Sequence, residues 1–259
     1  MSRYAVNGKE PTGAWLPTYD DAGNGTATLN DLGDNGRHGT LTNMNVATVW
    51  VADVDATFGG VRRIDTDGVN DFISLPFAAF PGAYPFSISV WVKATGVTNY
   101  AVLVADIGSL NALFGVGINS SGNGFSQSGD GGGSAVATST NSIASGTWGH
   151  ITAIFTSTTS RSVYLNNAGL TTNTASNTPS LASLDNISIG ALRRSSVFYY
   201  ATRFDDLRIF SSVLDASDRS YLATRRGRRA GGGGRLINGT SLVRPAGIAD
   251  HSPLIIGAT

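Results

Sequence analysis

The sequence contains no cysteine, a single glutamate and only two lysines. Without cysteine, the chain has no disulfide framework, no thiolate metal site and no cysteine nucleophile. Long surface helices usually depend on glutamate and lysine, so their scarcity argues against a helical bundle. Only 14% of the 259 residues are charged and 41% are hydrophobic, which is too apolar for a disordered chain. These absences leave a β-rich globular protein as the expected class.

Long apolar runs are also missing. No stretch approaches the ~18 apolar residues that a membrane-spanning helix requires. The first residues lack the apolar centre of a signal peptide. The sequence therefore predicts a protein with no membrane contact and no export signal of its own.

Several segments alternate apolar and polar residues with the period of two that is typical of β-strands. The clearest is residues 86–94, in which Phe86, Ile88, Val90 and Val92 fall on one face. Five more segments have a similar pattern, at residues 100–108, 150–157, 161–167, 187–192 and 203–214. At least six strands separated by turns predict an all-β protein, an antiparallel β-sandwich or jelly roll with an extended C-terminal tail.

Two segments depart from this pattern. Residues 120–142 are rich in glycine and serine and predict a long exposed loop or an edge hairpin, where variable binding residues tend to lie. Residues 215–227 predict the one helix of the chain, with Asp215 as N-cap, Tyr221 and Leu222 facing the body and Gly227 at its end.

Charge is distributed unevenly along the chain. Residues 1–218 hold 11 basic and 17 acidic residues, a net charge of −6, whereas residues 219–259 hold seven arginines and one aspartate, a net charge of +6. This asymmetry predicts contact with an anionic partner or with the acidic body of a neighbouring copy, the alternative being a solvated tail that raises solubility. The predicted domain organisation is an N-terminal arm (1–12), a sandwich (13–224) and a docking tail (225–259).

The basic tail mixes arginine with apolar residues and contains no aromatic residue after position 222 that could stack on bases. Docking on protein neighbours is therefore favoured, and nucleic acid is not an expected partner. The candidate docking residues are Arg225, Arg226, Arg228, Arg229, Arg235 and Arg244.

Several motifs occur in an order that resembles a known family. They are DLGDNGRHGTL (31–41), DGVNDF (67–72), FSISVWVK (86–93), TWGHITAIF (147–155), VYLNNAGL (163–170), ISIG (187–190) and FDDLRIFSSVLDASDRSYL (204–222). Together they resemble the concanavalin A-like lectin/glucanase superfamily over residues 13–224, in particular laminin G-like jelly rolls of the kind found in phage virion proteins. The resemblance implies the fold more strongly than a function, because this fold includes lectins, glycan hydrolases, adhesion modules and viral structural proteins.

Catalytic motifs are not found in the sequence. The family's glycan hydrolases use glutamates on one strand, in an E-x-D-x-x-E arrangement, whereas the single glutamate here is Glu10. Asp65 and Asp67 lie in a turn-like segment, and strand alternation predicts opposite faces for the adjacent Asp205 and Asp206. We therefore expect a protein that is not an enzyme. His150 is expected to be a structural hydrogen-bonding residue.

Two binding sites are predicted. Family members often hold a structural calcium ion near Asp-rich turns, and its candidate ligands here are Asp31, Asp34, Asp67 and Asp71. Ordinary turn chemistry is the alternative explanation for these aspartates. Candidate contacts for a glycan or a protein partner are the aromatic residues Tyr100, Phe198, Tyr199 and Tyr200.

Two functions remain open. The first is a non-enzymatic structural or adhesion protein of a bacteriophage virion, a capsid decoration or fibre-associated protein. It would assemble in the host cytoplasm, with capsid or fibre proteins or further copies of itself as partners. The alternative is a calcium-dependent, extracellular lectin module that binds a cell-surface glycan.

Overall fold

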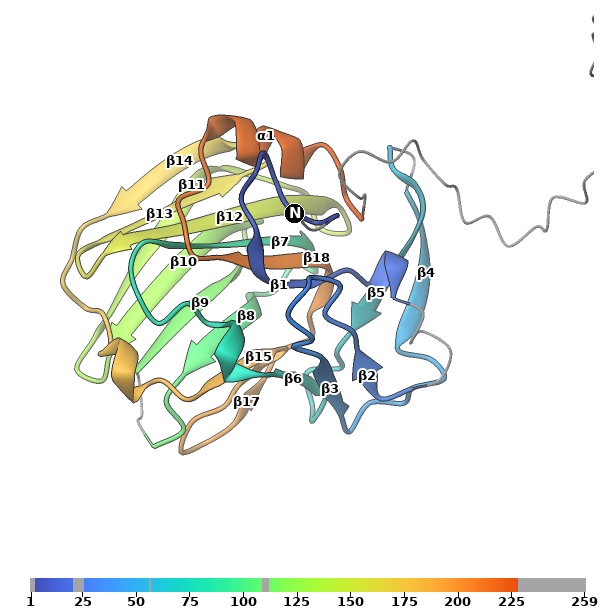
Figure 1. The fold of residues 1–259 in the computed structure, drawn as a ribbon, viewed down its shortest axis with the longest axis horizontal. Helices are drawn as coiled ribbons and strands as arrows, with labels where there is room; N and C mark the ends of the chain where they lie inside the picture. The colour runs from blue at the N-terminus through green and yellow to red at the C-terminus, as the bar shows by residue number, and fades with distance from the viewer. Residues whose placement is uncertain (1–2, 21–25, 56, 109–111, 228–259) are drawn as a thin grey trace, which may run out of the picture.

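The computed structural model describes residues 3–20, 26–55, 57–108 and 112–227. Two eight-stranded antiparallel sheets face each other and form a sandwich (Figure 1). The predicted all-β fold is therefore confirmed. Arg228, Arg229, Arg235 and Arg244 of the predicted docking tail lie outside the described residues. No helix in the described part of the chain has the length and apolarity needed to cross a membrane.

The first sheet, here called the helix-covered sheet, has seven strands in one path and an eighth, β1, paired with β18. In spatial order these are β14 (Ala168–Asn173), β13 (Ser160–Leu165), β12 (Trp148–Ser157), β7 (Phe86–Lys93), β18 (Arg203–Phe210), β5 (Gly59–Asp65) and β4 (Trp50–Asp55), with β1 at Pro11–Trp15.

The second sheet, here called the hairpin-covered sheet, contains β11 (Ser134–Ser142), β10 (Asn123–Asp130), β9 (Ala112–Ile118), β8 (Asn99–Ala105), β15 (Asn186–Ile189), β6 (Phe72–Leu75), β3 (Gly39–Thr42) and β2 (Thr28–Leu29). A separate two-stranded hairpin pairs β16 (Ala191–Leu192) with β17 (Phe198–Tyr199). Short 3-10 turns occupy Pro17–Tyr19 (η1), Phe77–Ala79 (η3) and Leu181–Ser183 (η4).

The hydrophobic core lies between the two sheets and follows the predicted alternation. Phe86, Ile88, Val90 and Val92 of β7 are all fully buried in it. Aromatic rings join the sheets, because Phe86 stacks on Phe155 of its own sheet at 4.7 Å between centroids and meets Phe114 of β9 at 5.2 Å. Alternation leaves every second side chain of each strand on the outer face of its sheet, and these outer faces differ.

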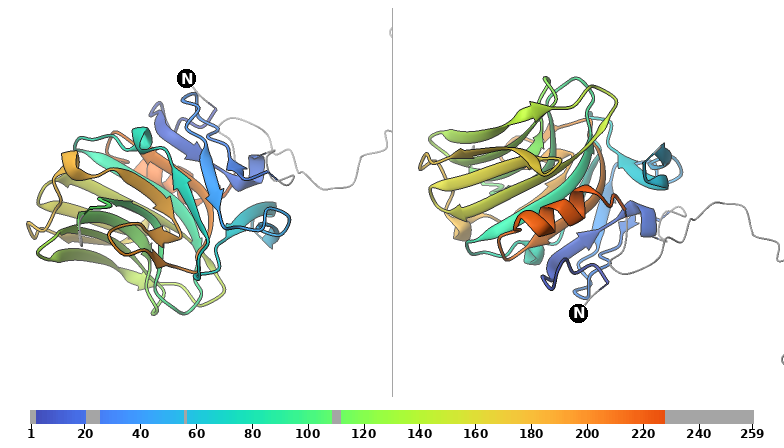
Figure 2. Two further views of the ribbon diagram at one scale, coloured as in Figure 1. Left: turned by 90° about the horizontal axis from the view of Figure 1, so that it is seen from below. Right: turned by 90° about the horizontal axis from the view of Figure 1, so that it is seen from above.

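One helix, α1 (Ala216–Ala223), covers the outer face of the helix-covered sheet (Figures 1 and 2). The predicted N-cap is confirmed, since the Asp215 carboxylate accepts hydrogen bonds from the backbone of Ser217 and Asp218. The predicted helix end is wrong, because α1 ends at Ala223 and Gly227 lies beyond it. Trp91 of the sheet donates a hydrogen bond from Nε1 to the Leu222 carbonyl, 3.2 Å away.

Residues 3–10 pack on the same face as α1. Lys9 pairs with Asp215 at 2.9 Å and also with the buried Asp218. Val6 is fully buried beside Phe210, Leu214 and Leu222. The N-terminal segment and the helix therefore form one continuous cover over this sheet.

Two local predictions need comment. Residues 120–142 form the β10–β11 hairpin at the edge of its sheet, so the edge-hairpin alternative holds rather than the long loop. The alternation predicted for Asp205 and Asp206 is wrong. The pairing of β18 with β7 shifts register there and Asp206 has a φ of 45°, so a bulge interrupts the alternation between the core residues Phe204 and Leu207.

Candidate functional site

The β16–β17 hairpin covers the outer face of the hairpin-covered sheet, on the side of the molecule opposite α1 (Figure 1). Its Leu192 packs in one buried cluster with Leu103 and Ala105 of β8 and Leu113 of β9. These contacts hold the hairpin and the tyrosine after it against the sheet.

Two of the predicted contact residues meet beside this hairpin. The rings of Tyr100 and Tyr200 lie 4.9 Å apart, although 99 positions separate them in the sequence. Phe125 of β10 meets the edge of the Tyr100 ring, also at 4.9 Å, and the Tyr100 hydroxyl donates a hydrogen bond to Gln127 Oε1. Burial raises the pKa of Tyr100 to about 12, so its phenol stays a neutral donor at physiological pH. We call Tyr100, Phe125, Gln127 and Tyr200 the tyrosine cluster.

Glycines in the neighbouring strand make room for these rings. A Cβ atom on Gly115 would lie 2.8 Å from the Tyr100 ring, and one on Gly117 would lie 2.9 Å from the Phe125 ring. A side chain at either glycine position would collide with one of the rings. Glycine therefore allows both rings to lie close to the β9 backbone.

The other two predicted aromatic residues lie in β17. Phe198 is 44% exposed, and the Arg194 guanidinium stacks over its ring at 4.6 Å. Tyr199 contacts Phe72 of β6, with ring centroids 6.4 Å apart, and Arg193 stacks on Phe72 at 5.2 Å. The hairpin thus presents aromatic rings and guanidinium groups next to the tyrosine cluster.

Sequence reasoning missed Phe125 and Gln127. A signal was present, because these two residues occupy one face of β10 while Gly115 and Gly117 occupy one face of the preceding strand. Two glycines at alternate positions in a strand indicate that another group approaches its backbone closely. The long-loop reading of residues 120–142 concealed this pattern.

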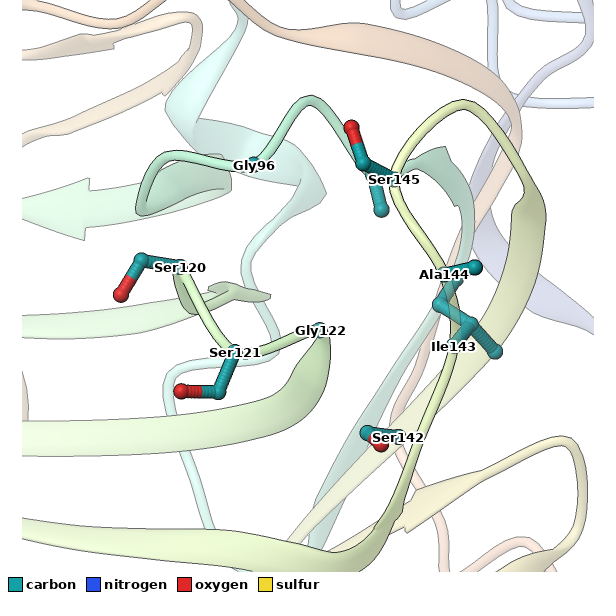
Figure 3. A pocket seen from close by; sticks show the side chains of 9 residues that line it. Gly96, Ser120, Ser121, Gly122, Ser142, Ile143, Ala144 and Ser145 are labelled. Atoms are coloured by element: carbon teal, nitrogen blue, oxygen red, sulfur yellow. The ribbon is translucent and has the colours of Figure 1, made fainter.

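A separate pocket of about 380 Å³ lies at one end of the sandwich (Figure 3). It is formed by the turns that follow β7, β9 and β11, and Gly96, Gly122 and Ile143 contribute to its wall. Four serines also line it, Ser120, Ser121, Ser142 and Ser145, and no charged or aromatic side chain does. The wall of the pocket is therefore uncharged.

The predicted calcium ligands lie in two turns. Asp31 is buried, and its carboxylate accepts hydrogen bonds from the backbone of Ala14, Gly33 and Arg37 at 2.9–3.0 Å. The exposed Asp34 follows in the same turn. The Asp31 carboxylate therefore stabilises this turn by accepting hydrogen bonds from three backbone amides.

Asp67 has a similar role in the second turn, since its Oδ1 accepts from the amides of Val69, Asn70 and Asp71. Burial and the neighbouring Asp67 charge raise the pKa of Asp71. Across the described ranges, no three His, Asp or Glu side chains gather closely enough to hold a metal ion. Calcium prefers six to eight oxygen ligands, and its binding at these turns stays a prediction.

Three of the four aspartates considered for catalysis pair with arginines, and the fourth, Asp67, accepts hydrogen bonds from backbone amides instead. Asp65 pairs with Arg63 at 2.7 Å, and Asp206 pairs with Arg208 at the same distance. The fully buried Asp205 lies 3.2 Å from Arg226, and burial raises its pKa to about 7 in spite of that arginine. The pairs of Asp205 and Asp206 are buried beneath the helix cover, whereas Asp65 is partly exposed.

His150 is also beneath this cover. It is 1% exposed, and its Nε2 lies 2.8 Å from Ser89 Oγ. Burial, with a contribution from the Arg208 charge, lowers its pKa to about 3. The predicted hydrogen-bonding role is confirmed.

The described part of the arginine-rich tail is attached to the body. Arg225 is exposed and stacks over Tyr221 at 4.3 Å. Arg226 is fully buried, so it contacts its own sandwich.

A protein-family model matches the middle of the chain. A laminin G-type family model, described as the concanavalin A-like lectin/glucanases superfamily, matches residues 67–218. That range contains the tyrosine cluster, the β16–β17 hairpin and the first three residues of α1. No relative was found among curated protein sequences.

Solved structures share the fold at low sequence identity. Domain 4 of AbnA, a GH43 extracellular arabinanase from Geobacillus stearothermophilus solved in complex with arabinotriose, is 18% identical, with a TM-score of 0.59 over 83% of this chain and 98% of that domain. The binding domain of Paraclostridial Mosquitocidal Protein 1 is 15% identical, with a TM-score of 0.58 over 83% of this chain.

Trypanosoma rangeli sialidase is 13% identical, with a TM-score of 0.57 over 82% of this chain. The present chain spans 52% of the mosquitocidal binding domain and 32% of the sialidase. At these identities the likeness establishes the fold.

Proposed function

This chain belongs to the concanavalin A-like lectin/glucanases superfamily, and we propose that it acts as a non-enzymatic glycan-binding module. The tyrosine cluster and the β16–β17 hairpin form the sugar-contacting surface. The ligand is an extracellular oligosaccharide with neutral sugar units.

The observation that carries this proposal is the meeting of Tyr100 and Tyr200 at 4.9 Å beside the amide of Gln127. Sugar recognition needs aromatic rings that stack on the apolar faces of the sugar and amide or hydroxyl groups that hydrogen-bond to its hydroxyls. The cluster offers both kinds of group within one patch. The exposed ring of Phe198 extends the patch toward solvent.

Two structural neighbours support the same conclusion. The arabinanase domain was solved with arabinotriose bound, and this chain covers nearly all of that domain. The similar part of the mosquitocidal protein is itself a binding domain. A sialidase also shares the fold, but the adjacent Asp205 and Asp206 considered for catalysis here are buried and paired with arginines.

The test is a glycan array probed with the labelled full chain, followed by titration calorimetry with the best ligand. Tyr200→Ala is expected to weaken binding about tenfold, because it removes one of the two tyrosine rings of the cluster. Tyr221→Ala is the matched control, since Tyr221 is also a half-buried tyrosine near an arginine but lies on the helix-covered side. Absence of binding to any glycan, or equal weakening by both variants, would contradict the proposal.

Calcium dependence is tested in the same titration. The predicted ligands Asp31, Asp34, Asp67 and Asp71 lie in turns rather than in the tyrosine cluster. A calcium-dependent lectin would lose its affinity in EDTA and regain it when calcium is added. Unchanged affinity would assign these aspartates to turn stabilisation alone.

A structural role in a phage particle is the second candidate, and the segregation of charge favours it. The net charge of −6 before residue 219 and +6 after it suits copies that pack body against tail, or a tail that docks on capsid or fibre proteins. Light scattering of the full chain and of a chain ending at Gly227, which keeps the buried Arg226, tests self-assembly. If both have the mass of a monomer, assembly through the tail is excluded at that concentration.

A further inference from the structure

Arg226 is fully buried although it lies in the most basic segment of the chain. Its Nη2 is 2.9 Å from Asp53 Oδ2 on β4, and its Nε is 3.2 Å from Asp205 Oδ2 on β18. Its guanidinium carbon lies 3.4 Å from the centre of the Trp148 ring on β12. A planar cation is thus held by two carboxylates and one aromatic face, which is the arrangement that a guanidinium group prefers.

Other residues hold these carboxylates in place. Asp53 accepts hydrogen bonds from Trp148 Nε1 at 2.6 Å and from Arg63 Nη1 at 2.9 Å. Asp205 accepts from Thr18 Oγ1 of η1 at 3.3 Å and from the Asp206 amide at 2.8 Å. Four elements from separate parts of the sequence therefore build the site independently of the arginine that fills it.

The structure also restricts which residue can follow Arg226. Gly227 has a φ of 59°, and a Cβ atom there would lie 2.7 Å from Thr18 Oγ1 and 3.3 Å from Asp205 Oδ2. The arginine-rich segment contains two adjacent pairs, Arg225–Arg226 and Arg228–Arg229, but only the first is followed by glycine, because residue 230 is alanine. Glycine at this position thus distinguishes Arg226 from Arg229.

We propose that Asp53, Asp205 and Trp148 form a guanidinium-binding socket that takes Arg226, chosen by the glycine that follows it, and so anchors the start of the arginine-rich segment. The ligand class is a guanidinium group followed by a glycine. This site lies on the helix-covered side, away from the tyrosine cluster, and does not depend on the proposed glycan binding.

The first test is chemical rescue of Arg226→Ala in the full chain. Removal of the guanidinium leaves the fully buried Asp205 without its cation and Asp53 with only Arg63 and Lys93, so the melting temperature is expected to fall by about 10 °C. Guanidinium chloride at low, non-denaturing concentration is expected to restore part of this loss, whereas sodium chloride and methylammonium chloride at equal ionic strength are not. Arg225→Ala is the matched control, because Arg225 is exposed, and its melting temperature should stay within about 2 °C of the wild type.

The second test concerns the glycine and is independent of whether Arg226→Ala folds. Gly227→Ala is compared with Gly82→Ala, because Gly82 also has a positive φ, of 69°, but has no atom within 4 Å of a Cβ. Both variants incur backbone strain, and only Gly227→Ala adds a collision, so it should lower the melting temperature further. If both variants lower the melting temperature equally, the proposal that Gly227 selects Arg226 is wrong. An Arg226→Ala chain that is no less stable than Arg225→Ala, or that guanidinium does not rescue selectively, would overturn the socket.

Discussion

The outer faces of the two sheets arise from the same strand alternation but have opposite chemistry. The face under α1 holds charged and polar groups at almost complete burial, including His150, Asp205, Asp206, Arg208 and Arg226. The face under the β16–β17 hairpin holds aromatic rings, and Phe198 reaches solvent. Charged groups that α1 and the N-terminal segment bury must be paired to be stable. The short β16–β17 hairpin instead leaves aromatic rings partly exposed, where a ligand can contact them. The difference agrees with the proposal that the first face serves stability and the second serves recognition.

The largest expected effect is on the helix-covered face. Arg208→Ala should lower the free energy of unfolding by about 3–5 kcal/mol, because Asp206 would be left buried without its partner. Arg203→Ala, on the same strand, should cost less than about 1 kcal/mol, because Arg203 is 44% exposed and its nearest carboxylate oxygen, on Asp65, is 3.7 Å away. Urea unfolding measures the free energy of unfolding of both variants. Equal losses would show that the buried ion pair contributes no more to stability than the exposed one.

The same face should respond to pH through two groups of opposite sign. Burial lowers the pKa of His150 to about 3, so in acid the unfolded chain takes up a proton that the folded chain does not, and stability is lost as pH falls below 6.5. Burial raises the pKa of Asp205 to about 7, so the folded chain binds the extra proton, and stability is gained as pH falls from about 7 to 4.

Each group contributes a slope of at most about 1.4 kcal/mol per pH unit, and in the wild type the two slopes largely offset each other. His150→Gln should therefore become relatively more stable between pH 6.5 and 4.5, and Asp205→Asn relatively less stable. Urea unfolding at three pH values measures the slopes. Curves parallel to that of the wild type would show that these groups do not titrate as their burial implies.

On the hairpin-covered face, a methyl group beneath Tyr100 should affect binding more than folding. Gly115→Ala places a Cβ 2.8 Å from the Tyr100 ring, so the ring must shift. We expect glycan affinity to fall about tenfold and stability to fall by about 1 kcal/mol. Gly132→Ala is the control, because its Cβ would meet only Asp130 Oδ1, at an ordinary 3.6 Å. Unchanged glycan affinity in Gly115→Ala would show that the tyrosine cluster does not take part in glycan binding.

The smallest effect on stability is expected at Phe198 of β17. Phe198→Ala should change the free energy of unfolding by less than about 0.5 kcal/mol, because the ring is already 44% exposed. Its loss of stacking should still weaken glycan binding roughly two- to tenfold. Leu170→Ala, 51% exposed on β14 of the other sheet, should leave binding unchanged. Equal affinities of the two variants would place Phe198 outside the binding surface.

The sequence predicted those parts of the fold that depend on local pattern. The alternation in β7 assigned Phe86, Ile88, Val90 and Val92 to the core, and Asp215 was identified as the helix cap, because both depend on residues close in sequence. The bulge at Asp206 was not predicted, since it depends on how β18 pairs with β7.

The candidate site was predicted in part. Tyr100 and Tyr200 were named separately, but only the hairpin that folds back over β8 brings them together. Arg226 was assigned to a docking tail from composition alone, and its burial depends on Asp53, Trp148 and Asp205, which are distant in the sequence. Long-range packing of this kind leaves no local signal.

The central claim is that the hairpin-covered face binds a glycan and the helix-covered face does not. Its most direct test is an NMR titration of the isotope-labelled chain with the best glycan from the array. The account predicts shift changes at Tyr100, Gln127 and residues 198–200, and none at Trp91 or His150 under α1. Changes confined to the helix-covered face, or to the serine-lined pocket around Gly122, would contradict it.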